Sequence, residues 1–131
     1  MTDDSDIDRG VMTKRINANF DPVSWDDDLR LEYQGEPFTG EVVETLGDQL
    51  LSQEFYVNGI PHGPNREWWS NGTLKLDGQA RHGLPYGVFR TWHENGQLAS
   101  EQHFSDDGQL HTVLEWDENG NPMAEEGSRE V

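Results

Sequence analysis

One phrase occurs three times in this sequence, as Trp68-Trp69-Ser70-Asn71-Gly72, as Trp92-His93-Glu94-Asn95-Gly96 and as Trp116-Asp117-Glu118-Asn119-Gly120, at intervals of 24 residues. A fixed period of this length indicates units that each form one supersecondary piece and bury their apolar surface by stacking on their neighbours. The sequence therefore predicts a repeat protein, whose functional contacts lie on an extended surface.

The period extends beyond tryptophan. Gly59-Ile60-Pro61-His62-Gly63 returns as Gly83-Leu84-Pro85-Tyr86-Gly87, and a looser copy begins at Gly35. The array runs from about residue 31 to about residue 124. In its last unit Asp107 stands where the first glycine stood, a drift that is typical of a terminal unit with a neighbour on one side only.

Each unit has the pattern of strands joined by tight turns. Asn-Gly pairs begin at residues 58, 71, 95 and 119. Such a pair predicts a hairpin with a type I′ turn, because this turn requires positive φ at both central residues. The segments between the pairs alternate with a period near two, and we expect prolines 37, 61, 64 and 85 at the turn ends of strands. Strands are predicted near 30–34, 40–46, 49–57, 65–70, 73–81, 87–93, 97–104 and 110–116.

These patterns predict an all-β fold, in which antiparallel β-hairpin repeats form an elongated, twisted meander sheet. With 32% apolar residues, a single sheet fits the composition better than a closed sandwich. The predicted domains are an acidic, partly disordered N-terminal segment or cap over residues 1–29, a repeat domain over 30–124 and a flexible tail over 125–131. Four apolar residues of the cap are expected to shield the first hairpin, namely Ile16, Phe20, Val23 and Trp25.

The chain is strongly acidic, with a formal net charge of −17. Residues 31–131 hold 18 of the 26 acidic side chains and 5 of the 9 basic ones, so the charge belongs to the repeats. Such a field favours a basic partner and disfavours nucleic acid and anionic membrane surfaces; the alternative is that it only keeps an exposed sheet soluble. The absence of cysteine, of a secretory start and of a long apolar run predicts a cytoplasmic protein.

No catalytic residue, cofactor or metal is predicted. A thin sheet offers few clefts in which acid and base groups converge, so we expect no enzyme. Histidines 62, 82, 93, 103 and 111 lack metal-ligand spacing; His93 and His103 flank one hairpin and are the pair that a two-histidine site would use, although zinc usually takes three or four ligands. Residues 117–121 resemble the start of a calcium loop, but Ser128 stands at its last ligand position, so a hairpin turn is predicted.

The aromatic stripe allows two interpretations. Trp68, Trp92 and Trp116, with leucines 74 and 98 and Phe104, are predicted to form the packed face of the sheet. Alternatively, part of the sheet is open as an interface, because aromatic residues and arginine are enriched at binding hot spots. The candidate partner contacts lie outside the stripe or at its rim, and they are Glu67, Trp69, Asp77, Tyr86, Phe89, Arg90, Glu94 and Glu101.

The array resembles a known family. Pro37-Phe38-Thr39-Gly40-Glu41-Val42 and Trp92-His93-Glu94-Asn95-Gly96-Gln97-Leu98 are similar to the MORN-type repeat variant found in the YwqK family of bacterial antitoxins, over roughly residues 31–124. The resemblance implies a cytoplasmic protein that neutralises a co-produced toxin by binding it.

The leading hypothesis is an antitoxin or immunity-type protein that binds a cationic toxin through an acidic, aromatic-bearing sheet surface. A general or self-associating interaction scaffold and a nucleic-acid mimic are the alternatives.

Overall fold

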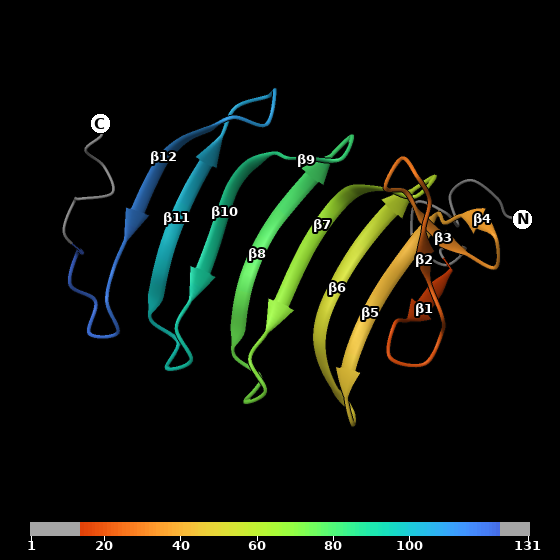
Figure 1. Cartoon of the computed structure of the whole chain (residues 1–131). Coiled ribbons are helices and arrows are strands. Elements are labelled where there is room, and N and C mark those ends of the chain that lie inside the picture. Colours follow the sequence, from red (N-terminus) through yellow and green to blue (C-terminus); the bar gives the residue numbers. More distant parts are fainter. Residues whose placement is uncertain (1–13, 124–131) are drawn as a thin grey trace, which may run out of the picture.

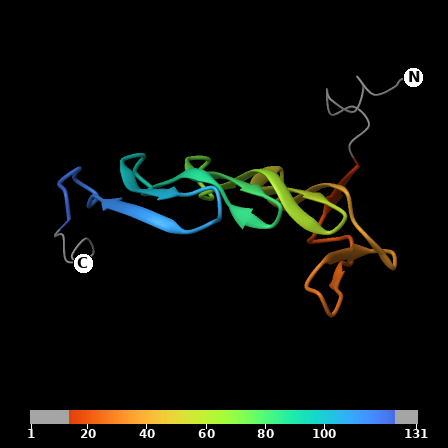
Figure 2. The ribbon, with the colours of Figure 1, turned by 90° about the horizontal axis from the view of Figure 1, so that it is seen from above.

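The computed structural model describes residues 14–123, which form two β-sheets and contain no helix. The larger sheet has the strand order β1, β5, β6, β7, β8, β10, β11, β12, with the short β9 paired to β8. Figure 1 shows these strands as a curved row in which each lies beside the next. Seen from above, the row is a single layer (Figure 2). The predicted all-β hairpin meander is confirmed.

Strands β5 to β12 make up the meander. They comprise Gly40–Leu46 (β5), Gln49–Val57 (β6), Ile60–Trp68 (β7), Leu74–Arg81 (β8), Leu84–Pro85 (β9), Gly87–Trp92 (β10), Leu98–Phe104 (β11) and Leu110–Glu115 (β12). Most bounds agree with the predicted ones to within a residue, but β7 begins well before residue 65. Pro64 therefore lies inside a strand, whereas Pro61 is at the turn end of β7, directly after the Asn58-Gly59 turn. The register shift between Glu54 and Tyr56 lies opposite them, where a proline without an N–H is tolerated.

The N-terminal end differs from the prediction. Strand β1 (Arg15–Asn17) pairs parallel with β5, so the large sheet is mixed. The first strand of the meander is predicted near 30–34. Instead, β3 (Leu31–Tyr33) joins β2 (Ser24–Trp25) and β4 (Glu36–Pro37) in a separate sheet. Figure 2 shows this small sheet, in orange, on one side of the large one. A period-two pattern is the same for a strand in either sheet, so it does not distinguish them.

The buried core lies where the two sheets meet. Its members are Ile16, Leu31, Phe38, Val42 and Tyr56. The tryptophans at 68, 92 and 116, by contrast, are only half-buried. The stripe predicted as the packed face is therefore only partly buried and lies outside the core, because a one-layer sheet has a second layer only where the small sheet covers it.

The predicted cap residues divide into two groups. Ile16 is 3% exposed within the core, and Val23 packs against that core. The ring of Trp25 meets Tyr56 edge-on at 6.4 Å between centroids, although Trp25 stays half-exposed. Phe20 is 77% exposed and does not shield the hairpin. Residues 1–13 of the predicted partly disordered segment, and the predicted flexible tail over 125–131, lie outside the described residues.

The Asn-Gly turns are of two kinds. Asn58 and Gly59 both have positive φ, at 52° and 82°, as a type I′ turn requires. At Asn71-Gly72 only the glycine does, and the N–H groups of Gly72 and Trp69 donate to the carbonyls of Trp69 and Thr73. That pattern is a type I turn followed by a glycine bulge. The same pattern recurs at 95 and 119, so the type I′ prediction is right at residue 58 and wrong at the other three.

Turn side chains give the 24-residue period a structural cause. The Asn71 side-chain amide donates to the Glu94 carbonyl at 3.0 Å, and Asn95 donates to Glu118 at 2.9 Å. The Asn71 Oδ1 atom also accepts from the N–H of Thr73 at 2.9 Å. Each asparagine thus fixes its own turn and ties it to the turn of the next unit, which requires the same residue at the same interval.

Candidate functional site

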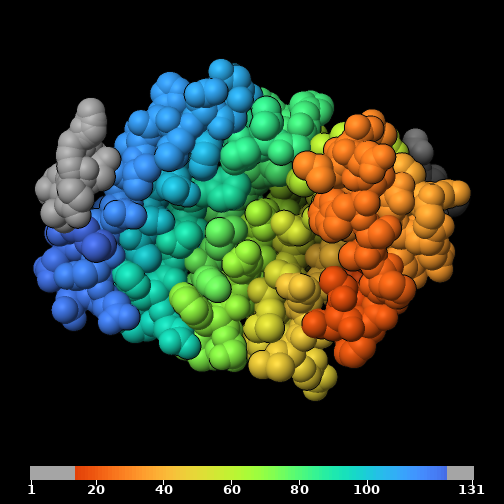
Figure 3. Space-filling model, in the orientation of Figure 1, coloured from red at the N-terminus to blue at the C-terminus, as the bar shows by residue number. Residues whose placement is uncertain are grey.

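The large sheet has two chemically different faces. Paired Cα positions share a face, and one such row contains Val42, Glu54, Asn65 and Gly78 on β5 to β8. We call the side of this row the front face; Val42 places the core and the small sheet on it. Figure 3 presents this side, with the orange residues of the small sheet over one end and the green and teal strands beyond them uncovered.

The uncovered part of the front face carries an aromatic pair. The Phe89 ring occupies the space above Gly78, where an added Cβ would stand 2.4 Å from the ring. The Phe89 and Phe104 rings meet edge-on with centroids 5.2 Å apart. Both residues are half-buried, so the pair is a partly accessible apolar centre on the front face.

Glutamates share the front face with this centre. Pairing across the strands puts seven residues in one row on the front face, and they are Glu44, Ser52, Glu67, Leu76, Thr91, Ser100 and Glu115. Glu54 lies in the neighbouring row. Glu44 and Glu54 accept hydrogen bonds from the hydroxyls of Ser52 and Tyr56, at 3.1 and 3.0 Å. Among the described residues, none of the four front-face glutamates has an ion-pair partner; they are Glu44, Glu54, Glu67 and Glu115.

The opposite side, which we call the ladder face, carries paired charges. Arg66 lies opposite Asp77, and Arg90 lies opposite both Asp77 and Glu101. The Arg66 Nε and Asp77 Oδ1 atoms are 3.2 Å apart, and the Arg90 Nε and Glu101 Oε2 atoms 2.9 Å. Alternating charges on neighbouring strands neutralise one another, so this face offers little net charge to a partner.

The ladder continues to the N-terminal edge of the sheet through Glu41. This carboxylate is 8% exposed and accepts two hydrogen bonds from Arg15, at 3.0 and 2.9 Å, and one from Gln53 at 2.7 Å. Burial raises the pKa of Glu41, but the hydrogen bonds from Arg15 and Gln53 outweigh it, so the pKa lies below its usual value. The charged form is therefore the one that the fold stabilises.

Replacing Glu41 with glutamine is expected to lower the free energy of unfolding by about 1–3 kcal/mol at neutral pH, because it removes charge-assisted hydrogen bonds. A lowered folded-state pKa gives stability that is present above the unfolded value of about 4.3 and lost as the pH falls through the folded value. The gap between the wild type and E41Q should therefore narrow below about pH 4.

Urea denaturation across this pH range measures the gap. Glu94→Gln, at an exposed turn, is the control and should change stability by less than about 0.5 kcal/mol. A gap for E41Q that is constant down to acid pH would contradict the assignment.

The structure separates the predicted contact residues. It places Asp77, Arg90 and Glu101 together on the ladder face, and Glu67 and Phe89 together on the front face.

The other three predicted contacts lie at the turn edges and have internal partners. The Trp69 indole N–H donates to the Trp92 carbonyl at 2.9 Å. The Arg81 guanidinium lies 3.8 Å from the Tyr86 ring centroid. Glu94 is exposed, and its backbone carbonyl accepts a hydrogen bond from the Asn71 side-chain amide. These three therefore have roles in joining or bounding the units.

Sequence reasoning missed the front-face residues Glu44, Glu54, Leu76, Phe104 and Glu115 as one surface. The signal that identifies them is the register between strands. Alternation along one strand shows which of its residues share a face, but not how that face aligns with the next strand.

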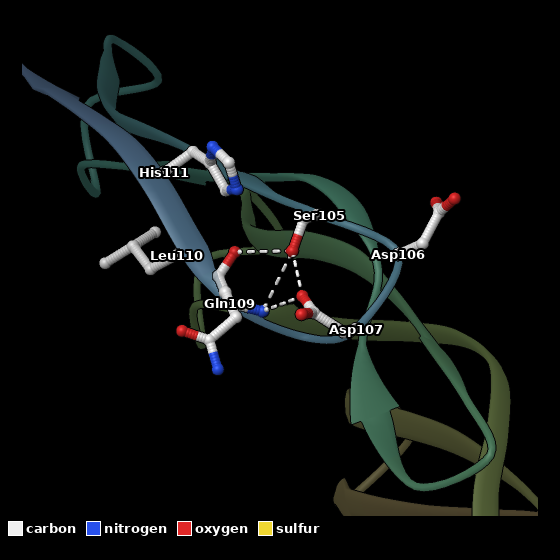
Figure 4. A pocket seen from close by; sticks show the side chains of 6 residues that line it. All are labelled: Ser105, Asp106, Asp107, Gln109, Leu110 and His111. Atoms are coloured by element: carbon white, nitrogen blue, oxygen red, sulfur yellow. Dashed lines mark hydrogen bonds between the residues drawn. The ribbon is translucent and has the colours of Figure 1, made fainter.

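A shallow, open hollow lies at the β11–β12 turn, lined by Ser105, Asp106, Asp107, Gln109, Leu110 and His111. Figure 4 shows Ser105, Asp107 and Gln109 bonded to one another, with Asp106 and Leu110 pointing away. Ser105 donates to Asp107, which lowers the pKa of Asp107, and the Gln109 N–H donates to the Ser105 Oγ at 3.2 Å. The Ser105 hydroxyl therefore bonds to residues of its own turn.

The two histidines considered for a metal are not used together. His93 Nε2 is bonded to the Trp116 carbonyl at 2.9 Å, and His103 Nε2 to Glu101 Oε1 at 3.2 Å. Over residues 14–123 no cluster of three or more histidine, aspartate or glutamate side chains could hold a metal.

The hairpin around β10 and β11 also matches a known protein family. Residues 85–106 match the family model described as the MORN repeat variant. This chain contains a MORN-type repeat. The matched unit includes Phe89 on the front face and Arg90 and Glu101 on the ladder face. It therefore contributes residues to both faces of the sheet.

A repeat of this kind fits a scaffold for protein interaction. The match concerns the repeat alone, and the resemblance to YwqK antitoxins stays a prediction. No significant match was found among curated proteins or among solved structures. The part of the chain that the structure describes has no helix long and apolar enough to cross a membrane.

Proposed function

We propose that this protein is an interaction scaffold that binds a cationic protein on its front face, acting by binding and not by catalysis. The observation that carries the proposal is that the Phe89–Phe104 pair shares the front face with glutamates that have no ion-pair partner among the described residues. Apolar contact and charge complementarity on one surface are what a partner with a basic, partly apolar surface requires.

The distribution of cations supports this choice of face. Within the described part of the array, the basic side chains are Arg66, Lys75, Arg81 and Arg90. Three form ion pairs with Asp77, Asp106 and Glu101, and Lys75 lies 4.5 Å from the Trp69 ring centroid. The basic side chains of the described repeats therefore do not neutralise the negative charge of the front-face glutamates.

The specific form of the proposal is an antitoxin or immunity-type protein whose partner is a basic toxin. It is supported by the resemblance to YwqK antitoxins and by the net charge of −17. A cytoplasmic location belongs to the same proposal. Electrostatic attraction would speed the encounter, and docking on the front face would then block the toxin.

Charge reversal tests the docking face. The double variant Glu67→Lys/Glu115→Lys should slow association with the partner by at least about tenfold at low salt. The control Glu94→Lys/Glu118→Lys makes the same change in net charge at exposed turns and should slow it less. Stopped-flow or surface binding at several salt concentrations gives the rates, and equal losses in the two variants would contradict docking on the front face.

The partner is found by retaining basic proteins from the host lysate at low salt and releasing them at high salt. Each is then expressed alone and together with this protein. The antitoxin form expects one protein that stops growth alone and is neutralised by co-expression. Salt-sensitive binding without growth arrest would leave a scaffold and reject the antitoxin, and salt-insensitive binding would reject the electrostatic mechanism.

A further inference from the structure

A second candidate site lies at the turn edge of the sheet. A hollow of about 280 Å³ is bounded by Val57, Asn58, Ile60, His62 and His82, between the turn after β6 and the turn after β8. Val57 is 45% exposed beside it. The hollow does not use the front-face glutamates, so the proposed function does not account for it.

The next repeat shows what occupies the equivalent place. Adding 24 to the residue number takes Val57 to Arg81, His62 to Tyr86 and His82 to Asp106. The Arg81 guanidinium stacks on the Tyr86 ring at 3.8 Å, and its Nη2 lies 3.5 Å from the Asp106 Oδ1. One repeat therefore places its own guanidinium where the other has an open hollow.

The hollow keeps the parts that would receive such a group. The His62 and His82 ring centroids are 5.2 Å apart, and the His82 N–H lies 3.2 Å from the His62 Nδ1 and donates to it. The His62 Nδ1 accepts this bond, and the ring is the aromatic group at the position that Tyr86 has in the next unit. Val57 and Ile60 give apolar contact for the methylene stem of an arginine.

We propose that this hollow binds an arginine side chain of another protein, with the stem along Val57 and Ile60 and the guanidinium on His62. Lysine fits less well, because its compact, strongly hydrated ammonium does not stack as the planar guanidinium does. The inference goes beyond the proposed function and does not depend on it, since a small arginine derivative is enough to test it.

The first experiment titrates the full-length protein with N-acetyl-arginine amide and follows the NMR signals of the His62 and His82 rings and of the Ile60 methyls. The expected result is a saturable shift of these signals, with N-acetyl-lysine amide binding at least about threefold more weakly. N-acetyl-leucine amide is the control for apolar filling. Equal shifts with the leucine derivative, or no shift with arginine, would overturn the proposal.

Variants then test the comparison between repeats. Val57→Arg combined with His82→Asp supplies the guanidinium and the carboxylate that Arg81 and Asp106 supply in the next unit, so added arginine should no longer bind. His62→Ala should weaken binding by about two- to fivefold, because it removes the stacking ring. Tyr86→Ala, which changes the filled place instead, should leave binding unchanged.

Unchanged signals of β10 and β11 show that a variant is folded. Arginine binding that persists in the folded Val57→Arg/His82→Asp variant would reject this hollow as the site.

Discussion

Replacing Leu31 with alanine is expected to lower the free energy of unfolding by about 2–5 kcal/mol. Leu31 is 1% exposed, and it brings the small sheet into the core formed with Ile16, Phe38, Val42 and Tyr56. The loss is expected to be large because the described residues contain no second cluster of buried hydrophobic side chains. A domain of this size commonly has about 5–15 kcal/mol in total, so this variant should be close to unfolding.

Urea denaturation followed by tryptophan fluorescence measures the change. Leu29→Ala is the matched control, because Leu29 belongs to the same segment but is 77% exposed, and it should change stability by less than about 0.5 kcal/mol. Equal losses for the two leucines would mean that the small sheet does not pack on the front face in solution.

Replacing Gly59 with alanine is expected to cost about 2–4 kcal/mol. Gly59 has φ +82°, and an added Cβ would stand 2.7 Å from the backbone oxygen of Leu31. The Gly59 carbonyl accepts from the Leu31 N–H at 2.9 Å, and its N–H donates to Phe38 at 2.7 Å. The methyl group therefore meets rigid backbone and disturbs the link between the first hairpin and the small sheet.

Gly47 separates the two causes of this loss. Its φ is also positive, at +59°, but nothing lies within 4 Å of an added Cβ. Gly47→Ala should therefore cost only the conformational part, about 1 kcal/mol. Thermal or urea unfolding of both variants gives the comparison, and similar losses would show that conformation, not the contact with Leu31, decides the effect at Gly59.

The small sheet covers only one end of the front face, and this difference along the large sheet bears on function. Near the small sheet, the front-face residues are buried in the core, where they stabilise the fold. Beyond it, Phe89 and Phe104 stay half-buried and Glu67 and Glu115 have no charged partner among the described residues. A partner that covers this part would supply the second layer that the single sheet lacks.

The sequence by itself determined the repeat, the all-β class and most strands of the meander. Tryptophans at equal intervals, Asn-Gly pairs and period-two alternation are local signals, and the bonds from Asn71 to Glu94 and from Asn95 to Glu118 explain why the interval is constant. The net charge also follows from the sequence alone, and with it the expectation of a basic partner.

Only the tertiary structure decided where the core lies and which residues share a face. Strand β3 leaves the meander because Leu31 and Phe38 are buried against Val42, a contact that no local pattern contains. Glu67 and Phe89 are on one face, and Asp77 and Arg90 on the other, because of the register between strands. Register depends on bulges and turns along the whole sheet, and pairing a strand one residue out of register would move its side chains to the opposite face.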